Sequence, residues 1–458
     1  MARNLPGPAD HLTVTAAHLD EHGAGVGVVD GLACHVADLL PGEEAEVALD
    51  HRSPHRPEAW GRVVRRIGPA SPARVTPACP AAGRCGGCTW QHLDGAEALR
   101  AKHARVAAAV ADLDCVRAGR VEVAAVRAAP AALGYRNKGK YVVGAAAGRV
   151  VLGAYAPRSH ELVDTVGCQV VAPIIDELAA WTRGAAEAAG VVPYDERTHR
   201  GELRYVVIRA SAAGLALVAL VTPTRVALTR LGPLAEALGR HPAVRGVVWI
   251  RHDRRDGAIV PREAATDLLV GAATLPDQVA GVPIAVGAAE FLQVNRDQAT
   301  ALYARVGELA EAGPGVRAGD LYAGVGGIAF TLARAGARVT AIELDAVAAR
   351  TLAAAAAAAG LPVDALAADA AALATLDARP DVVVVNPPRR GLSDAAHAAV
   401  LGCRPPRLLY VSCGPESLGR DLARWQAAGY QLDAIEPFDL MPGTGQVETV
   451  VRARLAAA

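Results

Sequence analysis

The C-terminal part of the chain alternates short apolar strands with helices, and this alternation most constrains the fold. Because each helix returns the chain to the starting edge of the sheet, the pattern is typical of a doubly wound, mostly parallel sheet. Ligands of such sheets bind beyond the carboxyl ends of the strands, so functional residues are expected there. From about Phe291, the expected elements are helix 298–312, strand 318–321, helix 328–335, strand 338–342, helix 346–359, and strands 381–385 and 408–411.

The first of these strands runs into a glycine-rich turn, Asp320-Leu-Tyr-Ala-Gly-Val-Gly-Gly327. Glycine lets the backbone approach a ligand closely, and an acid ending the next strand, here Glu343, typically binds ribose hydroxyls. A dinucleotide and S-adenosylmethionine both fit this pattern. The turn Asn386-Pro-Pro-Arg389 favours S-adenosylmethionine, because it offers a polar side chain beside the sulfonium. Asp369 is a candidate for binding the adenine, with an exposed loop acid as an equal alternative.

A cysteine follows the last expected strand, in Ser412-Cys413-Gly-Pro415. Carbon 5 of uracil is a poor nucleophile, but addition of a thiolate to carbon 6 generates an enolate that attacks a methyl group. A base must then remove the carbon 5 proton, and Glu448 is the candidate. The alternatives are a buried structural cysteine and an amine methyltransferase. In amine methyltransferases an aromatic residue typically follows Asn-Pro-Pro, whereas here Arg389 follows.

Four of the eight cysteines have metal-ligand spacing, with Cys79, Cys85 and Cys88 clustered and Cys168 far downstream. Four thiolates suit zinc or an iron–sulfur cluster, and zinc sites more often pair two Cys-x2-Cys knuckles. Spacing alone leaves both open. This cysteine usage favours a reducing compartment, and we expect a cytoplasmic protein.

The charge is balanced, with 47 basic and 47 acidic residues. Contact with nucleic acid would therefore depend on local basic clusters, although such runs are more often solvated faces. No apolar run approaches the roughly 18 residues of a membrane span, so no membrane partner is expected. One basic cluster contains Arg136, Lys138, Lys140, Arg149 and Arg158, interleaved with Tyr135 and Tyr141, and another contains Arg251, Arg254 and Arg255.

The first half of the chain is rich in expected strands. Short strands punctuated by glycine between residues 12 and 67 predict a small barrel. A Pro- and Ala-rich linker follows at 70–80, then helix 96–113 and a strand-rich stretch at 121–286 that contains helix 174–190.

Together these features resemble one family, the TRAM-domain, iron–sulfur RNA 5-methyluridine methyltransferases, which act on ribosomal RNA and, in related members, on transfer RNA. The resemblance spans nearly the whole chain. Cys79-Pro-x4-Cys85-Gly-Gly-Cys88-x2-Gln91-His92 is similar to the family's cluster motif. Gly134-Tyr-Arg-Asn-Lys138 resembles its RNA-facing segment, and Phe291-Leu-Gln293-Val-Asn295 resembles the start of its catalytic domain.

The resemblance implies a multidomain α/β protein: a TRAM-like barrel of the oligonucleotide-binding type at 1–68, a central iron–sulfur and RNA-binding domain at 69–288, and a Rossmann-like class I methyltransferase domain at 289–458. Helix 96–113 would pack on the last. The four cysteines would hold a [4Fe–4S] cluster, with zinc less favoured. Cys413 would be the nucleophile and Glu448 the base. The residues expected to bind S-adenosylmethionine are Gln293, Tyr322, Glu343 and Asn386, to which the pattern adds Gly324 and Asp369.

Three positions depart from the family pattern: Asn386 stands where many members have Asp, Gly327 where Asn is frequent, and Gln446 where His is frequent. The expected substrate is RNA, with ribosomal RNA favoured over transfer RNA, and the protein is expected to be a monomer. The competing functions are an amine methyltransferase of nucleic acid or protein, a non-catalytic RNA-binding protein, and an iron–sulfur oxidoreductase that binds NAD. Cys413 argues against the first, which would not need it, and Cys413 with Glu448 argues against the second. Binding of NAD in place of S-adenosylmethionine would establish the third.

Overall fold

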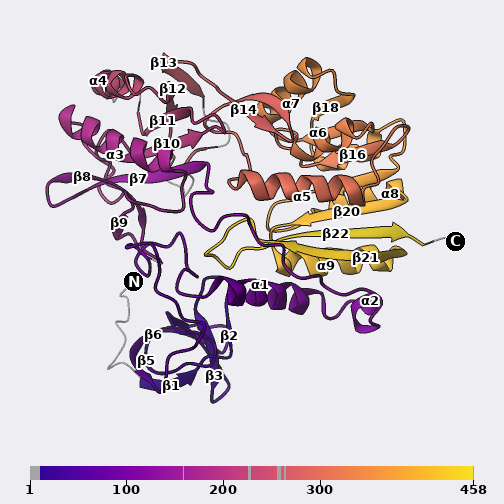
Figure 1. The fold of residues 1–458 in the computed structure, drawn as a ribbon, viewed down its shortest axis with the longest axis horizontal. Helices are drawn as coiled ribbons and strands as arrows, with labels where there is room; N and C mark the ends of the chain where they lie inside the picture. The colour runs from indigo at the N-terminus through magenta and orange to yellow at the C-terminus, as the bar shows by residue number, and fades with distance from the viewer. Residues whose placement is uncertain (1–10, 158, 225–227, 255–258, 262–264, 457–458) are drawn as a thin grey trace.

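The structure is a computed structural model and describes residues 11–157, 159–224, 228–254, 259–261 and 265–456. Within these ranges the chain forms three large sheets and a two-stranded hairpin (Figure 1). Among the helices of the same ranges, none has both the length and the apolar character that crossing a bilayer requires.

The N-terminal sheet has six strands in the order β1-β5-β6-β4-β3-β2, and β1 also contacts β3 so that the sheet curls. Its concave side buries Val14, Cys34, Val36 and Val47, which gives Cys34 a packing role. The strands are β1 (His11–Thr15), β2 (His18–Leu19), β3 (Gly25–Val29), β4 (Leu32–Ala37), β5 (Glu44–Arg52) and β6 (Glu58–Ile67).

Helix α1 (Gly95–Val110) lies between the N-terminal sheet and the C-terminal sheet (Figure 1). It begins after Asp94, whose carboxylate accepts hydrogen bonds from two backbone N–H groups of the first turn and so caps the helix. It packs on α9 (Pro415–Ala427) and β21 (Tyr430–Phe438). The predicted helix 96–113 ran too far, because a turn separates α1 from the short helix α2 (Asp114–Arg117).

The central sheet has seven strands in the order β13-β12-β11-β10-β7-β8-β9. Helices α3 (Pro173–Ala188) and α4 (Leu228–Gly239) cover one face, and the other face packs on the hairpin and the C-terminal elements. The strands are β7 (Lys138–Ala146), β8 (Arg149–Tyr155), β9 (Leu162–Asp164), β10 (Tyr205–Ala210), β11 (Ala216–Thr222), β12 (Val244–Arg251) and β13 (Thr266–Gly271), and the hairpin is β14 (Leu275–Val279) with β15 (Val282–Val286).

The C-terminal sheet is the predicted doubly wound sheet, with strand order β18-β17-β16-β19-β20-β22-β21. The first five strands are parallel, and β22 runs antiparallel to both its neighbours. This final antiparallel pair was not predicted. The elements are α5 (Arg296–Leu309), β16 (Arg317–Leu321), α6 (Gly327–Arg334), β17 (Arg338–Glu343), α7 (Ala346–Ala358), β18 (Val363–Ala367), the 3-10 helix η2 (Ala370–Thr375), β19 (Val382–Val385), α8 (Asp394–Cys403), β20 (Arg407–Ser412) and β22 (Glu448–Leu455), together with α9 and β21.

A buried ion pair fastens α1 to the C-terminal sheet. The Lys102 Nζ donates to Asp439 Oδ1 at 2.5 Å and to the Met441 carbonyl at 3.2 Å. Lys102 has no exposed surface and Asp439 is 6% exposed. The two charges compensate each other, so removing either one leaves an unpaired charge in the interior.

We expect Lys102→Ala to destabilise the protein by about 3–5 kcal/mol, because Asp439 then stays buried without its partner. Denaturant unfolding, followed by tryptophan fluorescence, measures the change. The matched control is Arg100→Ala on the same helix, which removes an exposed ion pair with Glu97 and should change the unfolding midpoint little. Equal effects of the two variants would contradict this role of Lys102.

Candidate active site

The register of β20 and β22 brings Cys413 and Glu448 together. Ser412, the last residue of β20, pairs with Thr449 of the antiparallel β22. Cys413 directly follows Ser412, and Glu448 directly precedes Thr449, so both predicted catalytic residues lie next to this last pair of the ladder. The charge of Glu448 acts on the Cys413 thiol, so the two side chains lie near each other although they are 35 positions apart in sequence.

Burial and one arginine determine the acidity of these two groups. Burial raises the pKa of Glu448 to about 8, although the Arg389 guanidinium opposes this shift. Burial and the negative charge of Glu448 raise the pKa of Cys413 to about 11, and Arg389 again opposes. Glu448 is 8% exposed, and its Oε2 has no hydrogen-bond partner. A buried carboxyl with a free oxygen beside a thiol can exchange protons with a ligand.

Cys413 opens into a cleft of about 220 Å³. The sequence motifs gave no role to Arg389, although its place directly after Asn386-Pro-Pro was a signal. Arg105 of α1 and Glu21 of the N-terminal sheet carry no local signal at all, because only the tertiary fold brings them here. The lining residues are Glu21, Arg105, Arg389, Cys413, Gly414, Pro415, Glu416, Gln446 and Val447.

The predicted cofactor residues on the glycine turn and its neighbours gather at the carboxyl ends of β16 to β19. Glu343 Oε2 accepts a hydrogen bond from the Gly324 backbone N–H at 2.8 Å. Gly324 has a φ of +56°, and the space where its Cβ would lie is open, which leaves room for a ligand. Tyr322 also has a positive φ, 62°, and burial and the charge of Asp369 raise its pKa. Asn386 follows β19, and its N–H donates to the Leu321 carbonyl.

Asp369 has a structural role that the sequence left open. Its carboxylate accepts a hydrogen bond from the Ala371 N–H at 2.9 Å and caps η2. The residue is exposed. Asp369 thus fits the alternative of a loop acid, while its position beyond β18 keeps it near Tyr322.

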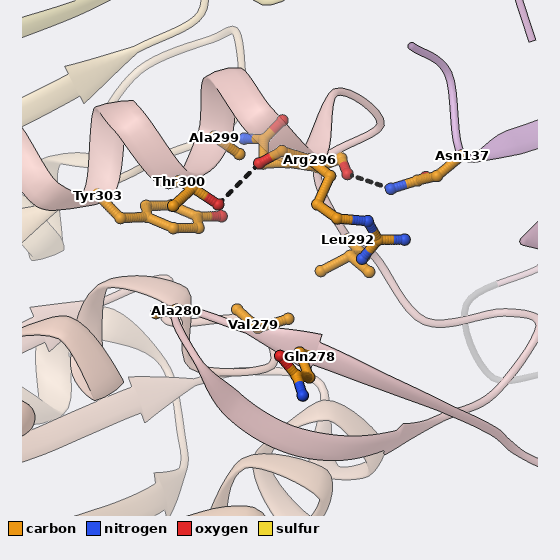
Figure 2. A pocket seen from close by; sticks show the side chains of 10 residues that line it. Asn137, Gln278, Val279, Ala280, Leu292, Arg296, Ala299, Thr300 and Tyr303 are labelled. Atoms are coloured by element: carbon orange, nitrogen blue, oxygen red, sulfur yellow. Dashed lines mark hydrogen bonds between the residues drawn. The ribbon is translucent and has the colours of Figure 1, made fainter. Parts of the chain in front are cut away.

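Gln293 lies in the segment before α5 and lines a small cavity, whose wall also includes Leu292 and Arg296 (Figure 2). The Asn137 side chain donates to the Gln293 carbonyl at 2.9 Å, so the residue directly before β7 holds this segment. The cavity measures about 20 Å³, which is room for one water molecule. Tyr303 of α5 also lines it.

Tyr303 connects the cofactor side with Glu448, and the sequence motifs did not single it out. A Cβ added to Gly327 would meet the Tyr303 ring at 2.5 Å, so glycine at this position allows the ring to lie against the glycine turn. Burial and the charges of Asp320 and Glu448 raise the pKa of Tyr303. Asp320 itself is fully buried, and burial with the charge of Glu343 raises its pKa to about 8.

The four predicted metal ligands lie within electrostatic reach of one another. Burial, together with the charges of Cys168 and Cys79, raises the pKa of Cys85. Burial and Cys168 likewise raise the pKa of Cys88 to about 11. In the part of the chain that the structure describes, no group of three or more His, Cys, Asp or Glu side chains is arranged to hold a metal ion.

The cysteine segment packs against the loop 442–447 that leads to Glu448. The Trp90 N–H donates to the Gly443 carbonyl at 2.8 Å, and a Cβ on Gly443 would lie 3.9 Å from the Cys88 Cβ. The Tyr135 hydroxyl donates to the Pro442 carbonyl at 3.2 Å. Residues that are more than 300 positions away in sequence therefore hold this loop.

The prediction that the first basic cluster offers its side chains to RNA phosphates is wrong for two of its members. Lys138 is 7% exposed, and its Nζ donates to the carbonyls of Ala288 and Glu290. Burial and the charges of Arg209 and Lys140 lower the pKa of Lys138 to about 6, so its surroundings disfavour the charged form. Tyr141 is 3% exposed and cannot stack on a base.

Other members of the basic clusters stay at the surface. Lys140, Arg149, Arg251 and Arg254 are exposed. Arg158 and Arg255 lie outside the described residues.

The strand order and the glycine turn define the class I methyltransferase fold. A solved structure with this fold, the Pyrococcus abyssi tRNA (uracil-54, C5)-methyltransferase in complex with S-adenosyl-L-homocysteine, superposes with a TM-score of 0.76 at 22% identity. The superposition covers 96% of this chain and 100% of the archaeal one. It thus includes the N-terminal and central sheets as well as the C-terminal sheet.

Curated relatives match along nearly the full length, although no protein-family model matches. An uncharacterized RNA methyltransferase of Thermosynechococcus vestitus is 35% identical and covers 94% of this chain and 95% of its own. RNA methyltransferases of Gloeobacter violaceus and Halalkalibacterium halodurans are 33% and 31% identical, and each covers 96% of this chain. They cover 95% and 96% of their own chains. The protein belongs to this family of RNA methyltransferases.

The charges around Cys413 predict opposite effects of two substitutions on its reactivity. Glu448→Gln removes a negative charge, so the pH midpoint for alkylation of Cys413 should fall. Arg389→Gln removes a positive charge, so the midpoint should rise. Iodoacetamide labelling across pH, read by mass spectrometry of the Cys413 peptide, measures both. Arg390→Gln is the matched control and should leave the midpoint unchanged; a shift in the same direction for both test variants would contradict this electrostatic account.

Proposed function

We propose that this enzyme transfers a methyl group from S-adenosylmethionine to carbon 5 of a uracil in RNA, through a covalent bond between Cys413 and carbon 6. The observation that carries the proposal is the placement of the Cys413 thiol in a cleft that Arg389 also lines, within reach of the buried Glu448 carboxyl. An enzyme for exocyclic amines needs no such thiol, because an amine is itself a nucleophile.

The reaction uses the two groups in sequence. The Cys413 thiolate forms a bond to carbon 6, and carbon 5 attacks the methyl group, whose bond to sulfur breaks. Glu448 then takes the carbon 5 proton, and the electron pair of that C–H bond restores the ring double bond as the bond from carbon 6 to sulfur breaks. Arg389 favours the ionised form of both groups, which is the form in which each acts.

The chain offers a fitting site for S-adenosylmethionine, which supplies the electrophilic methyl group. The open space above Gly324 and the Glu343 carboxylate beside it suit the ribose, and Tyr322 and Asn386 flank the same strand ends. Gln293 would bind from the opposite side, with Asp369 as the candidate for the adenine. Asn386 contributes a dipole without a charge, so it orients the methyl donor without neutralising the sulfonium.

We further propose that Cys79, Cys85, Cys88 and Cys168 hold a [4Fe–4S] cluster, with zinc as the less favoured alternative. Four partly buried thiols within electrostatic reach of one another suit soft metal ions. The cluster would fix the segment that supports the loop 442–447. Its role would therefore be structural, since the chemistry at Cys413 requires no electron transfer.

The proposed division of the chain follows its sheets. Residues 1–68 would be a TRAM-like RNA-binding barrel, 69–288 the central iron–sulfur and RNA-binding domain, and 289–458 the methyltransferase domain. Glu21 of the first part and Arg105 of the second line the cleft of the third, so RNA bound by the barrel would reach Cys413. We favour ribosomal RNA over transfer RNA, and a cytoplasmic monomer.

The decisive test is tritium release from RNA labelled at carbon 5 of uracil. We expect the wild type to release tritium from ribosomal RNA in the presence of S-adenosylmethionine, and Cys413→Ala to release none. Glu448→Gln should reduce release at least about 100-fold and accumulate an RNA–protein adduct stable in denaturing gels. Transfer RNA is assayed in parallel.

Three outcomes would contradict the proposal in different ways. Methyl transfer without tritium release would favour an amine methyltransferase. RNA binding without methyl transfer to either RNA would favour a binding protein. Release by Cys413→Ala at the wild-type rate would remove the covalent step.

The cluster is tested by composition. Protein purified without oxygen should contain iron and acid-labile sulfide in equal amounts, and Cys168→Ser should lose both because one of four ligands is missing. Cys403→Ser is the matched control, since Cys403 is equally partly buried but lies among the C-terminal helices. Zinc without sulfide in the wild type would support the alternative, and full metal content in Cys168→Ser would exclude that residue as a ligand.

A further inference from the structure

A buried carboxylate on α9 organises the turn that carries Arg389. Asp421 has no exposed surface. Its Oδ2 accepts hydrogen bonds from the Leu392 N–H at 2.9 Å and from the Tyr410 hydroxyl at 2.8 Å. Its Oδ1 accepts from the Arg420 Nε at 3.0 Å and lies 3.2 Å from the His397 Nε2. One carboxylate thus joins α9, β20, α8 and the turn after β19.

The turn is shaped to fit this carboxylate. Gly391 has a φ of +82°, and a Cβ there would lie 2.4 Å from Asp421 Oδ2. The Gly391 N–H bonds back to the Pro388 carbonyl at 2.8 Å, which closes the turn. Arg420 adds a second attachment, since its Nη2 donates to the Arg390 carbonyl at 2.7 Å.

The same turn reaches the cleft at its other end. A Cβ on Gly414, the residue after Cys413, would lie 3.1 Å from the Arg389 carbonyl, so the backbone of the turn packs on the backbone of the nucleophile. The Arg389 side chain is exposed and lines the cleft. Within the part of the chain that the structure describes, the Arg389 guanidinium forms no hydrogen bond or ion pair, so its position depends on the backbone of the turn.

We propose that Asp421 is a positioning residue: by anchoring the turn 388–392 to α9, it holds the Arg389 guanidinium beside Cys413 and Glu448. The inference rests on the proposed function, because it assigns to Arg389 the task of favouring the two reactive anions. Asp421 touches neither the thiol nor the cleft and acts only through the turn.

The charge of Asp421 is permanent under working conditions. Although burial opposes ionisation, the nearby His397 ring and the hydrogen bonds from the Leu392 N–H, Tyr410 and Arg420 lower the pKa of Asp421 to about 2. The anchor therefore does not titrate when Cys413 does. The charged and titratable groups that act on Cys413 are Glu448, Arg389 and Tyr410, and the cleft adds Glu21, Arg105 and Glu416.

Asp421→Asn tests the proposal, because an amide accepts hydrogen bonds at its single oxygen only. The variant therefore loses the hydrogen bonds that the second carboxylate oxygen of Asp421 accepts. The alkylation midpoint of Cys413 should rise, in the same direction as in Arg389→Gln. With labelled RNA, kcat should fall about 10- to 100-fold while the KM for S-adenosylmethionine changes little. In an Arg389→Gln background, Asp421→Asn should cause little further loss, because the two act through one group.

A second variant guards against loss of folding. Arg420→Gln changes an exposed side chain and removes the bonds to Asp421 and to the Arg390 carbonyl, so it should give a smaller shift in the same direction. Tyr430→Phe is the matched control for a lost buried hydrogen bond, because the Tyr430 hydroxyl donates to the Pro405 carbonyl, away from the turn. It should leave the alkylation midpoint unchanged.

Two results would overturn the role of Asp421. One is an unchanged alkylation midpoint in both Asp421→Asn and Arg420→Gln. The other is a loss of kcat that is as large with Gln at position 389 as with Arg, which would make Asp421 a general stability residue. A wild type that methylates no uracil would instead overturn the proposed function, and the alkylation arm would still report on Asp421.

Discussion

The antiparallel insertion of β22 between β20 and β21 is the constraint on which the candidate active site depends. Its register with β20 sets Thr449 opposite Ser412, so that Glu448 lies near Cys413. A shift of that register by one residue would turn Glu448 to the other side of the sheet. The buried strands on both sides resist such a shift, because Val450, Val451 and Ala453 are all completely buried. Glu448, the proposed base, is thus positioned by sheet packing, and not by the loop that precedes it.

The loop 442–447 has a different task, which is to close the cleft against the N-terminal half of the chain. Lys102 and Arg105 of α1 bind its two ends through the carbonyls of Met441 and Gly445, and the cysteine segment supports its middle at Gly443. The N-terminal part of the chain therefore contributes to the lining of the cleft, through Glu21 and Arg105. This explains how a helix that lies early in the sequence comes to pack on the last sheet.

The sequence indicates candidate site residues where they stand at or after a strand end. Gly324, Asn386 and Cys413 each follow a short apolar strand and Glu343 ends one, and parallel strands place their carboxyl ends at one edge of the sheet. The sequence does not indicate contacts that only the tertiary fold creates between distant segments. Nothing near Arg105 in the sequence indicates that it meets Gly445, more than 300 residues away. The predicted RNA contact of Lys138 was wrong because a run of basic residues usually lies at the surface, whereas Lys138 is a buried residue of β7.

The electrostatic design of the cleft follows from these placements. Burial opposes ionisation of Cys413 and of Glu448, and two adjacent anions oppose each other, so neither group ionises readily alone. A single cation, Arg389, acts on both. Arg389 lies on a turn that the buried Asp421 carboxylate anchors. The guanidinium therefore remains solvated while the anchored backbone fixes its position. A uracil that fills the cleft would displace that solvent and strengthen the same charges, so the site becomes most reactive when substrate is bound.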